Sequence, residues 1–202
     1  MKPRAYRLGR RQEAADRTKS RVLAAARKFL TSREAAQGFS IDAIARHAGV
    51  TRATVYHGFK SKTGLLGKLY DSLATDAALG DRIGLAFRAN GLTAALRRIV
   101  SAYCRLWTTN RLLIRRLHAL ADVDAGFSRA DRGEWRRAAL AALLAKHSDE
   151  LTAHFVRRQG EVVDTLHMLT SFETYDDLAR ARRSEAAVVR MIAVIALRVV
   201  NA

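Results

Sequence analysis

The 202-residue sequence has one cysteine, one proline and comparatively few acidic residues. The lone Cys104 excludes a disulfide within the chain and any zinc site built from cysteines, and it is compatible with a reducing compartment. The lone Pro3 and the scattered glycines exclude collagen-like and low-complexity classes. Because 49% of the residues are hydrophobic, the chain can bury a core, which excludes wholesale disorder and suits one large or two small domains.

The shortage of acidic residues leaves a large positive charge. Lys and Arg number 36 against 19 Asp and Glu, a formal net charge of +17, which indicates a polyanionic partner: nucleic acid or an anionic membrane surface. Arginine supplies 29 of the 36 basic residues, so GC-rich coding is an alternative source of part of the bias. Residues 1–65 hold 15 basic and 4 acidic residues (net +11), however, and residues 66–202 hold 21 and 15 (net +6). A uniform bias would not divide the charge in this way, so the polyanion-binding surface is expected near the N-terminus.

Long apolar runs are also missing. The longest, residues 186–200, contains Arg190 and Arg198 and is too short and too charged to span a hydrocarbon core of ~30 Å. No apolar run follows the basic first residues, so a secretory signal is not indicated. We therefore expect a soluble, cytoplasmic protein without a membrane partner.

The spacing of hydrophobic residues is helical and predicts an all-α fold. Residues 1–17 are polar and basic without periodicity and are interpreted as a flexible basic arm. From residue 18 one apolar stripe appears at i, i+3, i+4, i+7 and i+8, formed by Val22, Ala25, Ala26, Phe29 and Leu30.

Two short helices joined by a tight turn are predicted at residues 41–48 and 52–59. Ser40 and Thr51 are favourable N-caps, and Gly49 can adopt the left-handed conformation that the turn requires. The small Ala45 lets the helices approach, and the β-branched Val55 fills the gap between them. This spacing is typical of a helix-turn-helix, and an ordinary pair of antiparallel helices is the alternative. No acidic residue occurs between Ile44 and Tyr70, which favours DNA binding.

The stretch from Ile44 to Leu66, IARHAGVTRATVYHGFKSKTGLL, resembles the DNA-binding sequence of the TetR family of bacterial transcriptional regulators. The matching points are Ile-Ala, Ala-Gly-Val-Thr, Thr-Val-Tyr, the Phe three residues after the Tyr, and Ser-Lys followed by Leu-Leu. The resemblance covers residues 18–75 closely. It implies a non-enzymatic, cofactor-free homodimer, acting as a repressor that a small-molecule effector releases from a palindromic operator.

Two glycines depart from the family pattern. Thr63 and Gly64 stand where acidic residues are common, which is expected to weaken the start of the helix that begins at Lys62. Gly58 stands where a large polar residue is frequent, and glycine within a helix costs about 1 kcal/mol.

By this resemblance, the helix that Thr51 begins enters the major groove with its N-terminal residues at the base edges. Arg52 is the preferred candidate for base readout at guanine, with a phosphate contact as the alternative. Tyr56 and Lys62 are expected to hold phosphates, and His57 is assigned equally to DNA or to the junction with the next helix. The basic residues Arg10, Arg11, Arg17 and Lys19 could enter the minor groove. The full predicted DNA-binding set is Ser40, Arg46, Thr51, Arg52, Ala53, Thr54, Tyr56, His57, Lys60 and Lys62.

The helix-turn-helix gives a division into residues 1–17 (arm), 18–65 (DNA-binding domain) and 66–202 (effector-binding and dimerisation domain). After a link marked by glycines, helices are predicted at residues 92–109, 111–121, 124–147, 161–178 and 184–200. The last is apolar on nearly every side and predicts a four-helix-bundle dimer. The predicted interface consists of Val162, Leu166, Leu169, Val188, Met191, Ile192, Ile195 and Val199.

Large residues that could line an effector site, for which ordinary core packing is the alternative, are Tyr103, Trp107, His118, Trp135, His167 and Phe172. An enzyme is the main rival class, but the six histidines lack metal-ligand spacing and no phosphate loop or nucleophile elbow occurs. We therefore expect no metal and no catalytic residue. A basic helical protein that coats nucleic acid or binds RNA without sequence preference is the second alternative.

Overall fold

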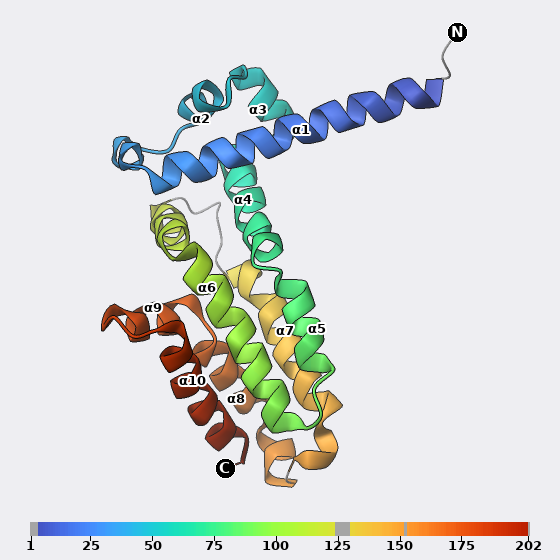
Figure 1. Cartoon of the computed structure of the whole chain (residues 1–202), viewed down its shortest axis with the longest axis vertical. Coiled ribbons are helices and arrows are strands. Elements are labelled where there is room, and N and C mark those ends of the chain that lie inside the picture. The colour runs from blue at the N-terminus through green and yellow to red at the C-terminus, as the bar shows by residue number, and fades with distance from the viewer. Residues whose placement is uncertain (1–3, 124–129, 152, 202) are drawn as a thin grey trace. The chain divides into compact units, whose positions relative to one another are not determined.

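A computed structural model describes residues 4–123, 130–151 and 153–201, and every regular element in these residues is helical (Figure 1). The all-α prediction is confirmed. The helices are α1 (Arg4–Thr31), α2 (Ile41–Ala48), α3 (Arg52–Phe59), α4 (Lys62–Asp76), α5 (Leu79–Phe87), α6 (Leu92–Val123), α7 (Ala130–Lys146), α8 (Ala153–Leu169), α9 (Phe172–Arg180) and α10 (Glu185–Asn201). Two short 3₁₀ helices, η1 (Arg33–Gln37) and η2 (Ser148–Glu150), follow α1 and α7.

The chain divides into two compact units. Of the described residues, unit 1 contains 4–72 and 115–123, and unit 2 contains 73–114, 130–151 and 153–201. The division falls inside α4, whereas the sequence placed a boundary between residues 65 and 66. The roles assigned to the two domains stay predictions.

The expected flexible arm is the clearest difference in unit 1, because α1 begins at Arg4 and residues 4–17 are helical. Neighbouring turns of this segment are joined by side-chain pairs, Glu13 with Arg17 (3.9 Å) and Asp16 with Lys19 (3.9 Å). Such i,i+3 and i,i+4 pairs support an exposed helix that has no apolar stripe. Hydrophobic periodicity therefore gives no signal for these turns.

The core of unit 1 matches the predicted stripe: Val22, Ala25, Ala26, Phe29 and Leu30 are all buried. Both α2 and α3 pack against α1, and Figure 1 shows them together along one side of it. From α6, the guanidinium of Arg116 donates to the carbonyls of Leu30 and Ser32, where α1 ends. Basic donors at a helix C-terminus satisfy carbonyls that lack an intrahelical partner.

The start of α4, which the sequence predicts to be weak, has a side-chain cap. Ser61 caps this helix by accepting a hydrogen bond from the Gly64 amide (2.9 Å). A β-carbon at position 64 would lie closer than 3.0 Å to the carbonyl oxygen of Phe59, a separation that real β-carbons essentially never show. Glycine is required here by the close approach of backbone and does not replace a missing acidic residue.

The helices of unit 2 differ from the prediction at their ends. The break predicted between residues 92–109 and 111–121 is confirmed, because α6 is kinked at Asn110, where the backbone is non-helical (φ −118°, ψ 15°). The expected helix 161–178 is two helices, because Ser171 ends the run and caps α9 by accepting from the Thr174 amide (3.1 Å). The expected glycine-marked link contains α5, which buries Leu79 and Ala86. Of the predicted helix 124–147, residues 130–146 form α7, and 124–129 lie outside the described residues.

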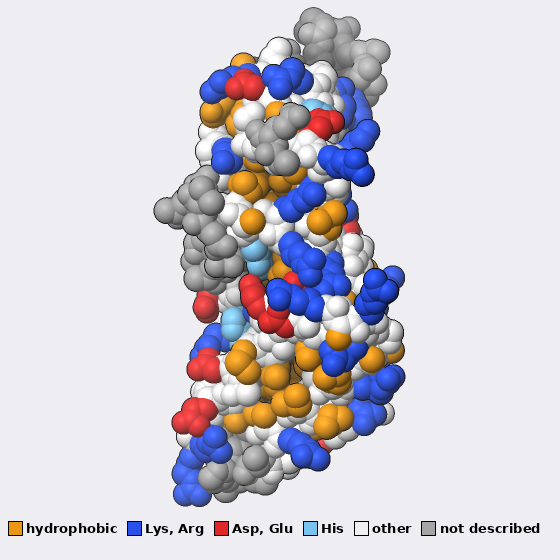
Figure 2. Space-filling view, turned by 90° about the vertical axis from the view of Figure 1, so that its left-hand side faces the viewer, with side chains coloured by type: hydrophobic (Ala, Val, Ile, Leu, Met, Phe, Trp, Pro, Cys, Tyr) orange, Lys and Arg blue, Asp and Glu red, His pale blue; other side chains and the backbone are white. Residues whose placement is uncertain are grey.

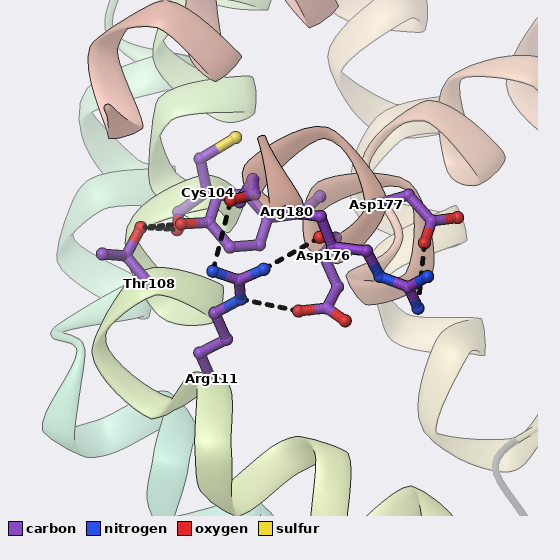
Figure 3. Close-up of polar contacts among 8 residues, drawn as sticks. Cys104, Thr108, Arg111, Asp176, Asp177 and Arg180 are labelled. Carbon is purple, nitrogen blue, oxygen red and sulfur yellow. Dashed lines mark hydrogen bonds and ion pairs between the residues drawn. The ribbon is translucent and has the colours of Figure 1, made fainter. Parts of the chain in front are cut away.

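A polar cluster joins α6 to α9 inside unit 2 (Figure 3). Arg111 donates from Nε to the carboxylate of Asp176 (2.6 Å), and from Nη2 and Nη1 to the carbonyls of Asp176 (2.9 Å) and Ala179 (3.4 Å). The side chain of Asp176 is only 8% exposed. Beside this pair, the hydroxyls of Thr108 and Tyr175 lie 2.7 Å apart.

We expect Arg111→Met to destabilise unit 2 by about 2–3 kcal/mol, because it removes three hydrogen bonds and leaves the Asp176 carboxylate buried. Urea unfolding of the full chain measures the change. Arg180→Met is the matched control, since Arg180 pairs with Asp177 (3.2 Å) while both side chains are more than two-thirds exposed, and it should change the midpoint little. Equal effects of the two substitutions would contradict this account of the cluster.

The N-terminus of α6 is capped from a distance. The Leu92 amide donates to both carboxylate oxygens of Glu150 (2.9 Å each), and His147 Nδ1 lies 2.9 Å from one of them. These hydrogen bonds, that of Leu92 first, lower the pKa of Glu150 below its ordinary value. The carboxylate thus joins η2 to α6 across 58 residues of sequence.

Candidate nucleic-acid interface

The turn between α2 and α3 forms as the sequence predicts. Ser40 accepts from the Ala43 amide (3.2 Å) and Thr51 from the Thr54 amide (3.1 Å), so both caps are confirmed. Gly49 ends α2 in the left-handed region (φ 61°, ψ 42°), as the turn requires. The local sequence alone therefore sets the bounds of both helices.

Burial separates the two faces of this motif. Ala45, Val55 and Phe59 are buried, and α2 and α3 pack against α1 and against each other. From α1, Arg21 donates to the carbonyl of Gly49 (3.3 Å) and ties the turn to the long helix. The packing holds the opposite faces of α2 and α3 toward solvent at a fixed relative angle.

The predicted DNA-binding residues lie on the outward faces. Thr54 and Lys62 are half-buried, and the rest are exposed: Ser40, Arg46, Thr51, Arg52, Ala53, Tyr56, His57 and Lys60. Lys60 ends α3 with a positive φ of 67°, and its amide donates to the carbonyl of Tyr56 (2.8 Å). All ten residues belong to unit 1, which also contains most of the excess charge of the sequence.

Arg52 is held by two neighbours. Its Nη1 donates to Oδ2 of Asp42 (2.9 Å), its Nη2 donates to the hydroxyl of Tyr56 (3.4 Å), and its guanidinium carbon lies 5.3 Å from the centre of the Tyr56 ring. The hydrogen bond with Tyr56 and the charge of Asp42 raise the pKa of Arg52. Sequence reasoning missed Asp42, because no local spacing rule links residues ten positions apart on different helices.

His57 lies beside a groove between α1 and α3. The groove has a volume of about 300 Å³ and is lined by Ala14, Ala15, Thr18, Lys19, Val22, Thr54, His57, Gly58 and Phe59. Gly58 leaves this space open, since a β-carbon there would meet Lys19 Cγ only at 3.7 Å. The groove adjoins the candidate interface, and its lining is mainly apolar.

Of the basic residues assigned to the arm, Arg17 and Lys19 are exposed side chains of α1. They extend from a helix and are paired with Glu13 and Asp16, so they are not on a free chain. The side chains of Arg10 and Arg11 lie outside the described residues.

Five of the six predicted effector residues belong to unit 2, and four of these five form two ring pairs. Tyr103 contacts Trp135 (5.9 Å between ring centres), Trp107 contacts Phe172 (5.8 Å), and Trp107 Nε1 donates to the carbonyl of Thr170 (2.9 Å). The exception is His118, which stacks on Tyr70 within unit 1 (6.5 Å).

Buried Arg136, which the sequence analysis missed, joins this aromatic group. Its Nη2 lies 2.8 Å from Nε2 of His167, and its guanidinium carbon lies 5.8 Å from the Trp107 ring centre. Burial, and next the charge of Arg136, lower the pKa of His167, while burial raises that of Tyr103 well above its usual range. The Tyr103 hydroxyl is buried without a hydrogen-bond partner.

Burial also raises the pKa of Cys104 to about 12, so this thiol stays protonated and unreactive at neutral pH.

The predicted dimer residues divide into two groups. Val162, Leu166, Leu169, Val188 and Ile192 are buried in the core of their own chain, which corrects their assignment to an interface. Met191 and Ile195 are exposed, and Val199 is half-buried. The sequence missed Val194 on α10 and Met168 on α8, both more than half exposed. Figure 2 shows hydrophobic side chains gathered on this face of unit 2, with Lys and Arg beside them.

These features define a helix-turn-helix DNA-binding protein: two capped helices at a fixed angle, a basic outward face, and a second helical unit. Residues 22–69 match the family model described as bacterial regulatory proteins, tetR family. That match identifies residues 22–69 as a DNA-binding domain of the TetR family, a family of non-enzymatic transcriptional regulators.

Two solved structures share the fold. One is a putative TetR-family transcriptional regulator from Mesorhizobium loti MAFF303099, with TM-score 0.67 and 21% identity over 92% of this chain and 96% of that chain. The other is a putative tetR family transcription regulator from Shewanella sp. PV-4, with TM-score 0.57 and 20% identity over 87% of this chain and 95% of that chain. No curated protein matches the sequence.

The described residues lack two kinds of feature. None of their helices combines the length and the apolar character needed to cross a membrane. Within residues 4–123, 130–151 and 153–201, no three His, Cys, Asp or Glu side chains are grouped closely enough to hold a metal ion.

Proposed function

We propose that this regulator is a repressor that binds a palindromic operator in the cytoplasm as a homodimer and is released by a small-molecule effector. The exposed N-terminal turn of α3 carries the DNA-binding part of the proposal. It presents Arg52 beside the capped start of α2, and packing against α1 holds both helices. Two such motifs in a dimer would meet successive major grooves about 34–36 Å apart.

Each exposed residue of the motif has a proposed role. Arg52 reads a guanine through O6 and N7, and Thr54 contacts a thymine methyl group or a phosphate. Tyr56 and Lys62 hold phosphates, and the free amides at the start of α2 add a contact near Ser40. The remaining members of the proposed contact surface are Arg46, Thr51, Ala53, His57 and Lys60.

The proposed dimer interface is the outer face of α8 and α10. Met168, Met191, Val194 and Ile195 are large apolar side chains exposed on these two helices, which pack against each other. Contiguous exposed apolar surface of this kind is typical of protein interfaces. Pairing this face with its copy would build a four-helix bundle.

The proposed effector site lies among the aromatic residues around Arg136. Tyr103 offers a buried hydroxyl without a hydrogen-bond partner, and Trp107 and Trp135 offer apolar surface. Binding sites commonly combine aromatic walls with a few such polar groups. His118 is not part of this proposal, because it belongs to unit 1.

Two substitutions separate base readout from backbone binding. We expect Arg52→Ala to relax the sequence preference at one base position per half-site, because a bidentate guanine contact is worth about 1–3 kcal/mol of discrimination. Lys62→Ala should weaken binding to all sequences alike and reduce the salt slope by about 1. Operator selection from a random DNA pool with each variant measures both effects. An unchanged sequence preference for Arg52→Ala would refute the proposed readout.

A further inference from the structure

Arg52 keeps donors available for DNA while it is held in place. Its guanidinium has five N–H groups, of which one donates to Asp42 and one to the Tyr56 hydroxyl. Three N–H groups remain, enough for a bidentate contact with guanine. The neighbours therefore fix the orientation of the side chain without consuming its capacity to read a base.

Asp42 carries a charge that is unfavourable for DNA binding in general. It lies in the first turn of α2 with half of its side chain exposed, in a sequence region that has no acidic residue from Ile44 to Tyr70. A carboxylate beside DNA repels phosphates and lowers affinity for every sequence. The N-terminus of α2 already has the Ser40 cap. A carboxylate in the first turn also interacts favourably with the positive end of the α2 dipole. The 2.9 Å ion pair with Arg52 gives it, in addition, a specific partner on the recognition helix.

We propose that Asp42 is a positioning residue that sets the base specificity of Arg52. An arginine side chain that is free to move contacts phosphates and bases in many orientations, which favours nonspecific binding. Pairing with Asp42 offsets part of the attraction of Arg52 to phosphates and limits its orientations. The affinity for the specific site then rises relative to the affinity for random DNA. This inference rests on the proposed base readout by Arg52.

The geometry assigns Tyr56 a supporting part. Its ring lies under the guanidinium and its hydroxyl accepts from Nη2, so Arg52 is held from two directions by residues on α2 and α3. Because α2 and α3 are themselves fixed by the caps and the buried core, the position of Arg52 is set by the whole motif.

The test uses the full-length protein and an operator selected from random DNA by the wild-type chain. At the base pair that Arg52→Ala relaxes, dissociation constants are measured for all four bases with wild type, Asp42→Asn, Arg52→Ala and the double variant. We expect Asp42→Asn to reduce discrimination at this base pair three- to fivefold, about the effect of losing one exposed ion pair, while affinity for random DNA is unchanged or higher. In the Arg52→Ala background, Asp42→Asn should change discrimination no further.

Asp71→Asn is the matched control, since it removes an exposed carboxylate of unit 1 that pairs with Lys68 (3.4 Å), and it should leave discrimination unchanged. Unchanged discrimination in Asp42→Asn overturns the inference while leaving the readout by Arg52 in place. An equal loss in the Arg52→Ala background also overturns it, because Asp42 would then contact the base itself. If Arg52→Ala relaxes no base position, both the inference and the proposed readout fail.

Discussion

Gly64→Ala is expected to destabilise unit 1 by about 2 kcal/mol or more. The new β-carbon would overlap the carbonyl oxygen of Phe59, and neither atom belongs to a flexible side chain that can move away. Relief requires a shift of α4 relative to the end of α3, and overpacking of this kind typically costs about 1–3 kcal/mol. Amide hydrogen exchange of residues 41–70 in the full-length protein measures the loss of protection where it occurs.

Gly58→Ala supplies a control of the same chemistry in the same unit. Its β-carbon would meet only Lys19 Cγ at 3.7 Å, an ordinary contact, and alanine is favoured over glycine inside a helix by about 0.5–1 kcal/mol. Protection of the same amides should therefore stay equal or increase. If both variants lose protection to the same extent, the close approach at position 64 is not the reason for its glycine.

Ile195→Asp is expected to convert the proposed dimer into a monomer and to lower operator affinity at least about a hundredfold. The side chain is 44% exposed on α10, so the carboxylate remains hydrated in a single chain, but burial at a dimer interface would cost several kcal/mol. A monomer also loses the gain in affinity from binding two half-sites at once. Sedimentation at micromolar protein and operator titration measure the two effects.

Leu85→Asp is the matched control, because Leu85 is 50% exposed on α5. Figure 1 shows α5 and α10 on opposite sides of unit 2, with α6 between them. This variant should remain a dimer and bind the operator normally. A dimeric Ile195→Asp variant with normal affinity would place the interface elsewhere, and a monomeric wild type would refute the dimer.

The sequence predicted the helix-turn-helix residue by residue because its determinants are local. Ser40, Gly49 and Thr51 act through hydrogen bonds and backbone angles within a few positions, so the bounds of α2 and α3 were correct. Elements fixed by tertiary packing were predicted less well. The low helix propensity of the glycines at positions 80 and 84 argued against a helix at α5. This helix is stabilised by the burial of Leu79 and Ala86, which requires the rest of unit 2.

The last helix shows a second limit of prediction. Because α10 is apolar on nearly every side, its sequence could not tell which side faces the chain's own core. The structure buries Val188, Ile192 and Ala196 and exposes Val194 and Ile195. Likewise, the pairing of Asp42 with Arg52 depends on the angle between two helices, which no sequence pattern specifies.

The net positive charge of the chain does not by itself indicate sequence-specific DNA binding. The excess in residues 1–65 supports attachment to any DNA, and a nonspecific coating protein would show the same excess. The distinguishing claim is that a few side chains on α3, beginning with Arg52, select one sequence. Their effect must therefore be measured against competing DNA.

Competition at physiological salt tests this claim most directly. The wild-type protein is bound to its selected operator, and random duplex DNA of the same length is added in up to about a hundredfold excess. Specific regulators typically prefer their sites by 10³-fold or more, so we expect most of the operator to stay bound. Release of the operator in proportion to the added random DNA would contradict sequence-specific recognition and favour nonspecific coating.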